Sequence, residues 1–199
     1  MSRGRSSYRG ADARTRQAKA QGYPARSVFK LEEIDRRLRL LKPGQRVLDL
    51  GAAPGSWSLY ASQRVGPTGH VFAVDLSEIT QAFGKNVTVL QGDALDLDND
   101  ALASEGPYDL VLSDMAPRTS GSKIQDQARS AELFMRALAV AVALGAPGSH
   151  FVGKLFMSAE FTAARQAVRD HFESEKTIRP SGTRQQSSEV FLVGVGLRR

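Results

Sequence analysis

The sequence predicts an α/β protein with a doubly wound, Rossmann-like fold, in which helices cover both faces of a mostly parallel sheet. Its length of 199 residues fits one domain. From residue 46 onward, short apolar runs alternate with helical or loop stretches, an order typical of parallel strands joined by crossover helices. The runs are nearly continuous in apolar residues, as is usual for strands that are buried on both faces.

The elements can be placed in order along the chain. A first helix is expected from the N-cap residue Ser27 to Leu41, because aliphatic side chains between Leu31 and Leu41 recur at helical spacing. Strands are then expected at residues 46–50, 70–76, 87–90, 108–114, 150–156 and 189–197. Helical or loop stretches separate them at residues 55–65, 77–86, 126–144 and 158–173, and a polar, turn-rich stretch covers residues 180–188.

Positive charge is concentrated at the N-terminus. Residues 1–30 hold eight Lys and Arg residues against one Asp, a net charge of +7, so the other 169 residues carry −1 of the total of +6. Basic residues interleaved with Ser, Gly and two tyrosines are typical of a segment that binds nucleic acid, and a solubilising tail is the alternative. We expect a basic, flexible arm over residues 1–22 and a folded domain over residues 23–199.

The composition limits the compartment and excludes some kinds of site. The chain has no cysteine, which excludes disulfides and zinc–thiolate sites and suits a reducing, cytoplasmic environment. No metal site is expected. The N-terminus lacks the apolar segment of a secretion signal, and the longest apolar run, residues 133–145, is interrupted by Arg136 and too short to span a bilayer. A membrane role is therefore not expected.

Charged residues recur where the predicted strands end. Asp75 and Asp114 end the second and fourth strands, Asp93 follows the third, and Lys154 lies near the end of the fifth. Ligands of doubly wound domains bind at this carboxyl edge of the sheet. A carboxylate at the position of Asp75 is placed to accept hydrogen bonds from ribose hydroxyls, with an ordinary surface carboxylate as the alternative.

The loop after the first strand, residues 49–57 (DLGAAPGSW), is rich in small residues. It lacks the dinucleotide-binding pattern G-x-G-x-x-G, because Ala53 replaces the second glycine, and Pro54 has no N–H to offer a phosphate. This argues against a nucleotide-dependent oxidoreductase and favours a ligand without phosphates, such as the amino acid part of S-adenosylmethionine. A plain strand–helix turn is the alternative. Trp57 either lines the ligand pocket or belongs to the core.

Three later segments carry the candidate chemistry, namely residues 113–117, 152–156 and 187–191. A lysine inside an apolar strand is costly unless it is paired, so Lys154 is expected to find Asp114 and Glu189. A structural ion-pair network is the alternative. A non-catalytic RNA-binding protein would account for the basic arm but would have no need of such a buried lysine.

The motifs DLGAAPGSWS, SDMAPRTSG, VGKLF and SSEVFLV, with Lys30 in SVFKLEEID, resemble the FtsJ (RrmJ) family of RNA ribose 2′-O-methyltransferases, from about Tyr23 to the C-terminus. The resemblance implies a class I S-adenosylmethionine-dependent methyltransferase fold for residues 23–199. It places the catalytic tetrad of the family on Lys30, Asp114, Lys154 and Glu189. With the small residues of the first loop, the expected cofactor residues are Gly51, Ala53, Gly55, Ser56, Trp57, Asp75, Asp93 and Asp114.

The resemblance leaves the RNA substrate open, because relatives act on ribosomal RNA, tRNA anticodon loops or mRNA caps. A small chain with a short basic arm is most similar to bacterial members that modify 23S rRNA. We therefore expect a monomer that methylates a uridine ribose of the large ribosomal subunit. The chain departs from the family pattern at Ser56, where glycine is common, and at Phe191, where tyrosine is common. Lys154 is either the base that takes the hydroxyl proton or a cation that stabilises the oxyanion.

Overall fold

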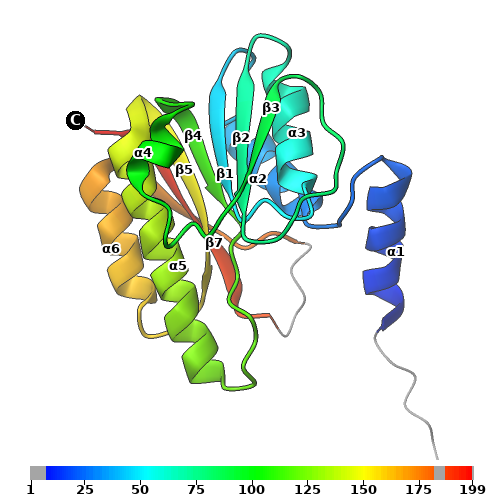
Figure 1. The fold of residues 1–199 in the computed structure, drawn as a ribbon. Coiled ribbons are helices and arrows are strands. Elements are labelled where there is room, and N and C mark those ends of the chain that lie inside the picture. The colour runs from blue at the N-terminus through cyan, green and yellow to red at the C-terminus, as the bar shows by residue number, and fades with distance from the viewer. Residues whose placement is uncertain (1–7, 182–186, 199) are drawn as a thin grey trace, which may run out of the picture.

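A seven-stranded sheet forms the centre of the molecule in the computed structural model, which describes residues 8–181 and 187–198 (Figure 1). The expected arm residues 1–7 and part of the turn-rich stretch, residues 182–186, lie outside the described residues. The strands are β1 (Arg46–Leu50), β2 (His70–Asp75), β3 (Val87–Gln91), β4 (Tyr108–Ser113), β5 (Gly145–Phe156), β6 (Phe172–Ile178) and β7 (Glu189–Leu197). The helices are α1 (Tyr8–Ala20), α2 (Val28–Leu38), α3 (Ser56–Val65), α4 (Asn99–Ala103), α5 (Lys123–Leu144) and α6 (Phe161–His171).

The strand order is β3-β2-β1-β4-β5-β7-β6. Strands β1 to β5 run parallel, and β7 runs antiparallel to both β5 and β6. The chain builds outward from β1 to β3 and then returns to build the other half from β4. This reversal puts a topological switch point between β1 and β4, the place where such sheets bind ligands.

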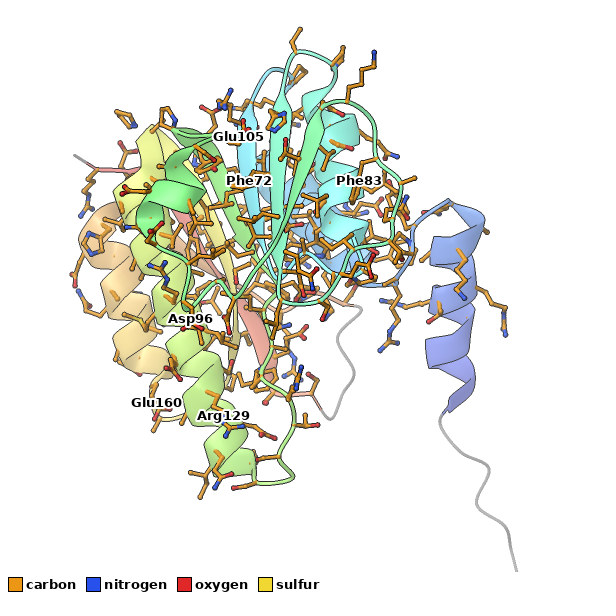
Figure 2. The ribbon with its side chains drawn as sticks, in the orientation of Figure 1. Phe72, Phe83, Asp96, Glu105, Arg129 and Glu160 are labelled. Carbon is orange, nitrogen blue, oxygen red and sulfur yellow. The ribbon has the colours of Figure 1, made fainter. Side chains whose placement is uncertain are left out.

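Two hydrophobic layers cover the sheet. Helices α2 and α3 pack on one face, where Leu31, Ile34 and Trp57 join side chains of the strands. Helices α4, α5 and α6 pack on the other face, and Phe134 of α5 lies in this second cluster. Figure 2 shows Phe72 within the side chains that fill the space beside the sheet. The predicted doubly wound α/β architecture with a mostly parallel sheet is thus confirmed.

Several elements differ from the sequence-based expectations. Helix α1 was not predicted, because its sequence YRGADARTRQAKA has no apolar stripe, and Figure 1 shows it standing outside both helical layers. Strand β6 was also missed, since only the first and last residues of FESEKTI are buried. Strand β5 begins at Gly145, earlier than predicted. Helix α2 ends at Leu38 because Arg39 takes a left-handed conformation with φ of +53°.

None of the described helices combines the length and the apolarity that crossing a membrane requires.

Candidate active site

The connection from β1 to α3 turns sharply beside the ends of β2 and β4. Gly51 has a φ of +77°, and the N–H groups of Gly51 and Ala52 both donate to the carbonyl oxygen of Val74, at 2.9 and 3.1 Å. A Cβ atom added to Gly51 would lie 2.6 Å from Cγ of Met115. Glycine is needed for both the backbone conformation and the close approach. The loop therefore lies directly against the residue that follows Asp114.

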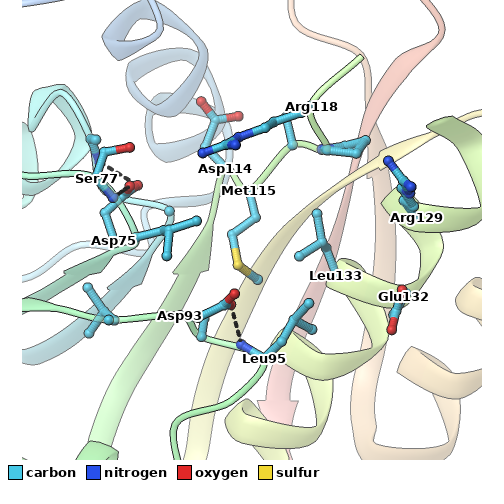
Figure 3. Close-up of a pocket in the computed structure, with 18 residues that line it drawn as sticks. Asp75, Ser77, Asp93, Leu95, Asp114, Met115, Arg118, Arg129, Glu132 and Leu133 are labelled. Atoms are coloured by element: carbon cyan, nitrogen blue, oxygen red, sulfur yellow. Dashed lines mark hydrogen bonds between the residues drawn. The ribbon is translucent and has the colours of Figure 1, made fainter. Parts of the chain in front are cut away.

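Backbone N–H groups hold the carboxylates at the ends of β2 and β3. Asp75 accepts hydrogen bonds from the N–H groups of Ala53, at 2.9 Å, and Ser77, at 2.7 Å. Asp93 accepts one from the N–H of Leu95, at 2.9 Å (Figure 3). No described basic side chain forms an ion pair with either carboxylate. Both are fixed in place while keeping oxygen lone pairs for a ligand.

These groups surround a cavity of about 690 Å³ at the switch point. Its walls come from the ends of β1, β2, β3 and β4 and from α5 (Figure 3). The volume suits a cofactor-sized ligand. Five of the eight expected cofactor residues line the cavity, namely Gly51, Ala53, Asp75, Asp93 and Asp114.

The other three expected cofactor residues do not line this cavity. Gly55 has a φ of +106° and caps the N-terminus of α3. The Ser56 hydroxyl accepts a hydrogen bond from the N–H of Ala25 and donates one to its carbonyl oxygen, at 2.8 and 3.1 Å. The indole N–H of the buried Trp57 donates to the carbonyl oxygen of Ser27, at 2.9 Å. These contacts attach α3 to the segment before α2, and a cofactor role for the three residues stays a prediction.

Lys154 of β5 is buried, with 7% of its side chain exposed, and is held by a single residue. Its Nζ lies 2.9 Å from Oδ1 of Asp114 and 2.5 Å from the carbonyl oxygen of the same residue. A buried ammonium group needs this kind of pairing. Because Asp114 also lines the cavity, the pair places the ammonium group of Lys154 next to a residue of the cavity wall.

A second ion pair joins Lys30 of α2 to the start of β7. Nζ of Lys30 lies 2.7 Å from Oε1 of Glu189, which is also largely buried. The same Nζ lies 5.9 Å from the ring centre of Phe191, and this ring packs against Trp57 with 5.7 Å between ring centres. The sequence had assigned both Asp114 and Glu189 to Lys154. The structure instead pairs Glu189 with Lys30, because α2 packs on the sheet face to which Phe191 of β7 also belongs.

The pairing of β5 with β7 brings the two ion pairs to one place. Lys154 is opposite Phe191, and Phe156 is opposite Glu189. Side chains two residues apart on a strand share a face, so Lys154 and Glu189 are diagonal neighbours on the same side of the sheet. The four predicted catalytic residues thus gather at the carboxyl edge as two ion pairs. Among residues 8–181 and 187–198, no group of three or more His, Cys, Asp or Glu side chains could hold a metal ion.

Comparison with known proteins settles the family. A family model described as FtsJ-like methyltransferase matches residues 23–197. The chain belongs to the FtsJ-like methyltransferases. The resemblance seen in the sequence is thereby confirmed.

Relatives of this FtsJ-like methyltransferase include proteins named "Ribosomal RNA large subunit methyltransferase E". The one from Sorangium cellulosum is 70% identical over 188 residues, which cover 94% of this chain and 89% of the relative. The one from Syntrophobacter fumaroxidans is 49% identical over 195 residues, covering 97% of this chain and 99% of the relative. A crystal structure described as a ribosomal RNA methyltransferase of Plasmodium falciparum has a TM-score of 0.74 at 22% identity, covering 88% of this chain and 98% of the other, and it supports the fold.

Asp49 is a buried residue of this FtsJ-like methyltransferase whose importance the sequence analysis missed. Its side chain is completely buried at the end of β1, where Oδ2 accepts a hydrogen bond from the hydroxyl of Ser58 at 2.6 Å. Oδ1 has no hydrogen-bond partner within the described part of the chain. The pKa of Asp49 is raised to about 7, mainly by burial and also by the nearby charges of Asp114 and Asp75, against the lowering effect of the Ser58 hydrogen bond. The Asp49 carboxyl group, next to the loop after β1, therefore keeps its proton at a pH well above the ordinary range for an aspartic acid.

Arg136 is a second residue that the sequence does not mark, since it only interrupts an apolar run there. From α5 its guanidinium group donates to the carbonyl oxygens of Ala94, at 2.9 Å, and Leu97, at 2.5 Å, and to the side chain of Asn99, at 3.2 Å. Two of these acceptors belong to the loop that follows Asp93, and Asn99 begins helix α4. Arg136 therefore fixes one wall of the cavity from behind. No pattern in the sequence reveals this, because the acceptors are mainly backbone carbonyls.

Proposed function

We propose that the chain transfers a methyl group from S-adenosylmethionine to the 2′-hydroxyl of a ribose, a uridine ribose of 23S rRNA in the large ribosomal subunit. The observation that carries the chemistry is Lys154, buried and held by Asp114 at the edge of the cavity. The rRNA substrate is supported by the names of the relatives, which are similar to this chain over nearly its whole length.

The residues around the cavity fit S-adenosylmethionine. The cofactor carries a positively charged sulfonium and an ammonium group, and the carboxylates of Asp75, Asp93 and Asp114 line the space. Gly51 and Ala53 leave room for a ligand at the end of β1, and Asp75 is placed to accept hydrogen bonds from ribose hydroxyls. When bound, S-adenosylmethionine supplies a methyl group on an electron-poor sulfur that departs as a neutral thioether.

Lys154 is the residue through which the hydroxyl is activated in this proposal. An ammonium group has three N–H donors, and Asp114 takes two of them among the described residues. The third donor remains for the oxygen of the 2′-hydroxyl, so a charged lysine stabilises the negative charge that develops there. If the lysine has first lost a proton, its lone pair accepts the hydroxyl proton instead. In both cases Asp114 fixes the position of Nζ.

Lys30 and Glu189 shape the substrate side of the site. Glu189 holds Lys30 at 2.7 Å, so the second ammonium group stays next to the ring of Phe191 rather than extending into solvent. The contact positions a second positive charge close to where the ribose and its phosphates would lie. We propose this positioning as the reason that the tetrad contains two lysines and two acids.

The basic segment over residues 1–22 is proposed to bind RNA outside the site. Within α1, the described basic side chains are Arg14, Arg16 and Lys19, and two of these are exposed. We further propose that the protein acts in the cytoplasm as a monomer, with the large ribosomal subunit as its partner.

The function is tested by mapping 2′-O-methyl groups on RNA from cells with and without the protein. A 2′-O-methylated nucleotide resists alkaline cleavage, because the hydroxyl that attacks the neighbouring phosphate is blocked. We expect one position of 23S rRNA to lose its resistance and to regain it on expression of the wild type but not of Lys154→Ala. If only tRNA loses a methylated position, tRNA rather than rRNA is the substrate. If no RNA changes, the proposal is contradicted.

The arm is tested by deleting residues 1–22. We expect weaker RNA binding and a shallower dependence of the association constant on salt, because phosphate contacts release counterions. S-adenosylmethionine affinity should stay the same, since all the cavity residues remain. Binding titrations at several KCl concentrations measure both quantities, and an unchanged salt dependence would make the segment a solubilising tail.

A further inference from the structure

Two arginines line the same cavity as the candidate cofactor carboxylates. Arg118 lies in the connection from β4 to α5, and Arg129 lies in the first half of α5. Both side chains are exposed, and neither guanidinium group forms a hydrogen bond or ion pair with another residue in the described part of the chain. Arg136 of the same helix, by contrast, donates hydrogen bonds to three acceptors. Two uncommitted guanidinium groups at a ligand site indicate an anionic ligand.

The segment that carries Arg118 is held in place. The buried carboxylate of Asp126 accepts hydrogen bonds from both the N–H and the hydroxyl of Ser120, each at 2.8 Å. Asp126 lies one turn before Arg129 on α5, so the same residue ties the loop to the helix and sets the relative position of the two arginines. Figure 3 shows the Arg118 side chain pointing toward Asp114, with Arg129 on the α5 side of the cavity.

We propose that Arg118 and Arg129, the arginine pair, bind RNA phosphates next to the ribose that receives the methyl group. This inference rests on the proposed function. Asp114 and Lys154 mark the position of the 2′-hydroxyl, and in RNA the 3′-phosphate is attached through the adjacent ring carbon. A side chain that points toward Asp114 is therefore close to the phosphates of the target nucleotide. Guanidinium groups are well suited to phosphate oxygens, which they contact through two parallel N–H groups.

The two sides of the cavity differ in charge. Three of its four acids, Asp75, Asp93 and Asp114, stand at the ends of β2, β3 and β4, where they would face a cofactor with cationic groups, and the fourth, Glu132, lies on α5. The arginine pair stands on the other side, on the β4–α5 connection and α5. The carboxylate of the cofactor is a second anion that the arginine pair could bind. Measurements of cofactor affinity distinguish this alternative from binding of RNA phosphates. Unlike the arm, the arginine pair acts on the target nucleotide itself, so its contribution persists when residues 1–22 are absent.

The experiment compares Arg118→Gln, Arg129→Gln and the double variant with the wild type. Methyl transfer to large ribosomal subunits, isolated from cells that lack the protein, is measured at several KCl concentrations. Equilibrium dialysis with S-adenosylhomocysteine measures the cofactor site separately. Lys176→Gln removes one exposed positive charge on β6, at the far edge of the sheet, and serves as the matched control.

We expect the double variant to lower kcat/KM for the subunits about tenfold or more at moderate salt. The slope of log kcat/KM against log salt concentration should become shallower by roughly 0.7 to 0.9 for each lost phosphate contact. S-adenosylhomocysteine affinity should stay within about twofold of the wild type, and Lys176→Gln should behave as the wild type. The same loss should appear when the variants are made without residues 1–22.

Three results would overturn the inference. A tenfold loss of S-adenosylhomocysteine affinity with an unchanged salt slope would assign the arginine pair to the cofactor's carboxylate. Unchanged kcat/KM in the double variant, with an active wild type, would contradict the arginine assignment alone. Wild-type protein that transfers no methyl group to the subunits would contradict the proposed function, and the inference with it.

Discussion

The two halves of the candidate site hold their charges in different ways. On the cofactor side, backbone N–H groups fix Asp75 and Asp93, and no described basic side chain forms an ion pair with either of them. On the substrate side, each lysine of the tetrad is tied to an acid, Lys154 to Asp114 and Lys30 to Glu189. The first half presents carboxylates that have no cationic partner among the described residues. The second half holds two ammonium groups in fixed positions through their ion pairs. Substitutions in the two halves should therefore fail in different ways.

Lys154→Ala is expected to have the largest effect and to test the substrate half. Methyl transfer should fall by about a thousandfold or more, in the range of a lost acid–base or oxyanion-stabilising group. S-adenosylmethionine should still bind, because the side chain contacts Asp114 rather than the cofactor-side carboxylates. Single-turnover methylation and calorimetric titration with the cofactor measure the two quantities.

Lys154→Arg separates the two roles left open for the lysine. Arginine keeps the positive charge but cannot act as a base near neutral pH. Substantial activity would favour stabilisation of the oxyanion, and near-zero activity would favour proton abstraction. If Lys154→Ala unfolds readily yet keeps full activity per folded molecule, Lys154 is structural and the comparison between the two halves breaks down.

Asp49→Asn tests whether the buried Asp49 carboxyl group on the cofactor side is protonated in the folded protein. The raised pKa of about 7 means that the folded state holds its proton in a pH range where the unfolded state has lost it. The stabilising effect of protonation is thus complete below about pH 4 and is lost as pH rises toward 7. Between pH 5 and 8, the free energy of unfolding of the wild type should fall by about 3 kcal/mol relative to that of Asp49→Asn. This is about 1.4 kcal/mol for each pH unit over the roughly two units between pH 5 and the folded-state pKa.

Urea unfolding of both proteins across this pH range, without cofactor, provides the comparison. Asp96→Asn is the control, because Asp96 is exposed and should show no such difference. A wild type and an Asp49→Asn variant that change in parallel with pH would show that Asp49 is ionised in the folded protein.

Asp75→Ala is expected to weaken S-adenosylmethionine binding at least tenfold, or about 1.4 kcal/mol. The fold should remain, because Asp75 is only half-buried and water can replace it at the N–H groups of Ala53 and Ser77. Calorimetry measures the affinity, with the exposed Glu78→Ala as control. An affinity within a factor of two of the wild type would remove Asp75 from the cofactor site.

Arg136→Met should have the smallest effect. Without its three hydrogen bonds the loop after Asp93 becomes less well fixed, so KM for S-adenosylmethionine should rise about fivefold, or about 1 kcal/mol, at unchanged kcat. Arg165→Met is the matched control, since Arg165 is also half-buried and bonded to Glu175, but on α6 and β6. If both variants raise KM equally, the effect is general destabilisation rather than loop positioning.

The fold could be predicted where burial imposes a pattern on the sequence. Strands β1, β2 and β4 are apolar on both faces and were placed within a residue or two. The edge strand β6 buries only Phe172 and Ile178, so its sequence carries no alternation, and α1 outside the helical layers carries no apolar stripe. Strand β6 pairs with β7 through backbone hydrogen bonds, which leave no mark on the sequence.

The site was predictable as a set of residues but not as a set of contacts. The motif resemblance named Lys30, Asp114, Lys154 and Glu189, whereas the pairing of Glu189 with Lys30 depends on how α2 packs against the sheet. Trp57 and Ser56 were assigned to the cofactor from their place in the loop, yet their polar atoms bond to the segment before α2. A position in a motif fixes which edge of the sheet a residue reaches, and packing then decides where it points.

The reversed direction of β7 determines where its first residue lies. In a sheet with every strand parallel, a strand in that slot would begin at the opposite edge, and Glu189 would stand roughly 25–30 Å from the end of β5. Because β7 enters from the ligand-binding edge, Glu189 meets Lys30 there and lies diagonally opposite Lys154 of β5. The carboxylates Asp75 and Asp93 belong to the other half of the sheet, at the ends of β2 and β3. One edge of the sheet thus collects charged groups from two stretches of chain that lie far apart in the sequence, and it does so because a single strand reverses its direction.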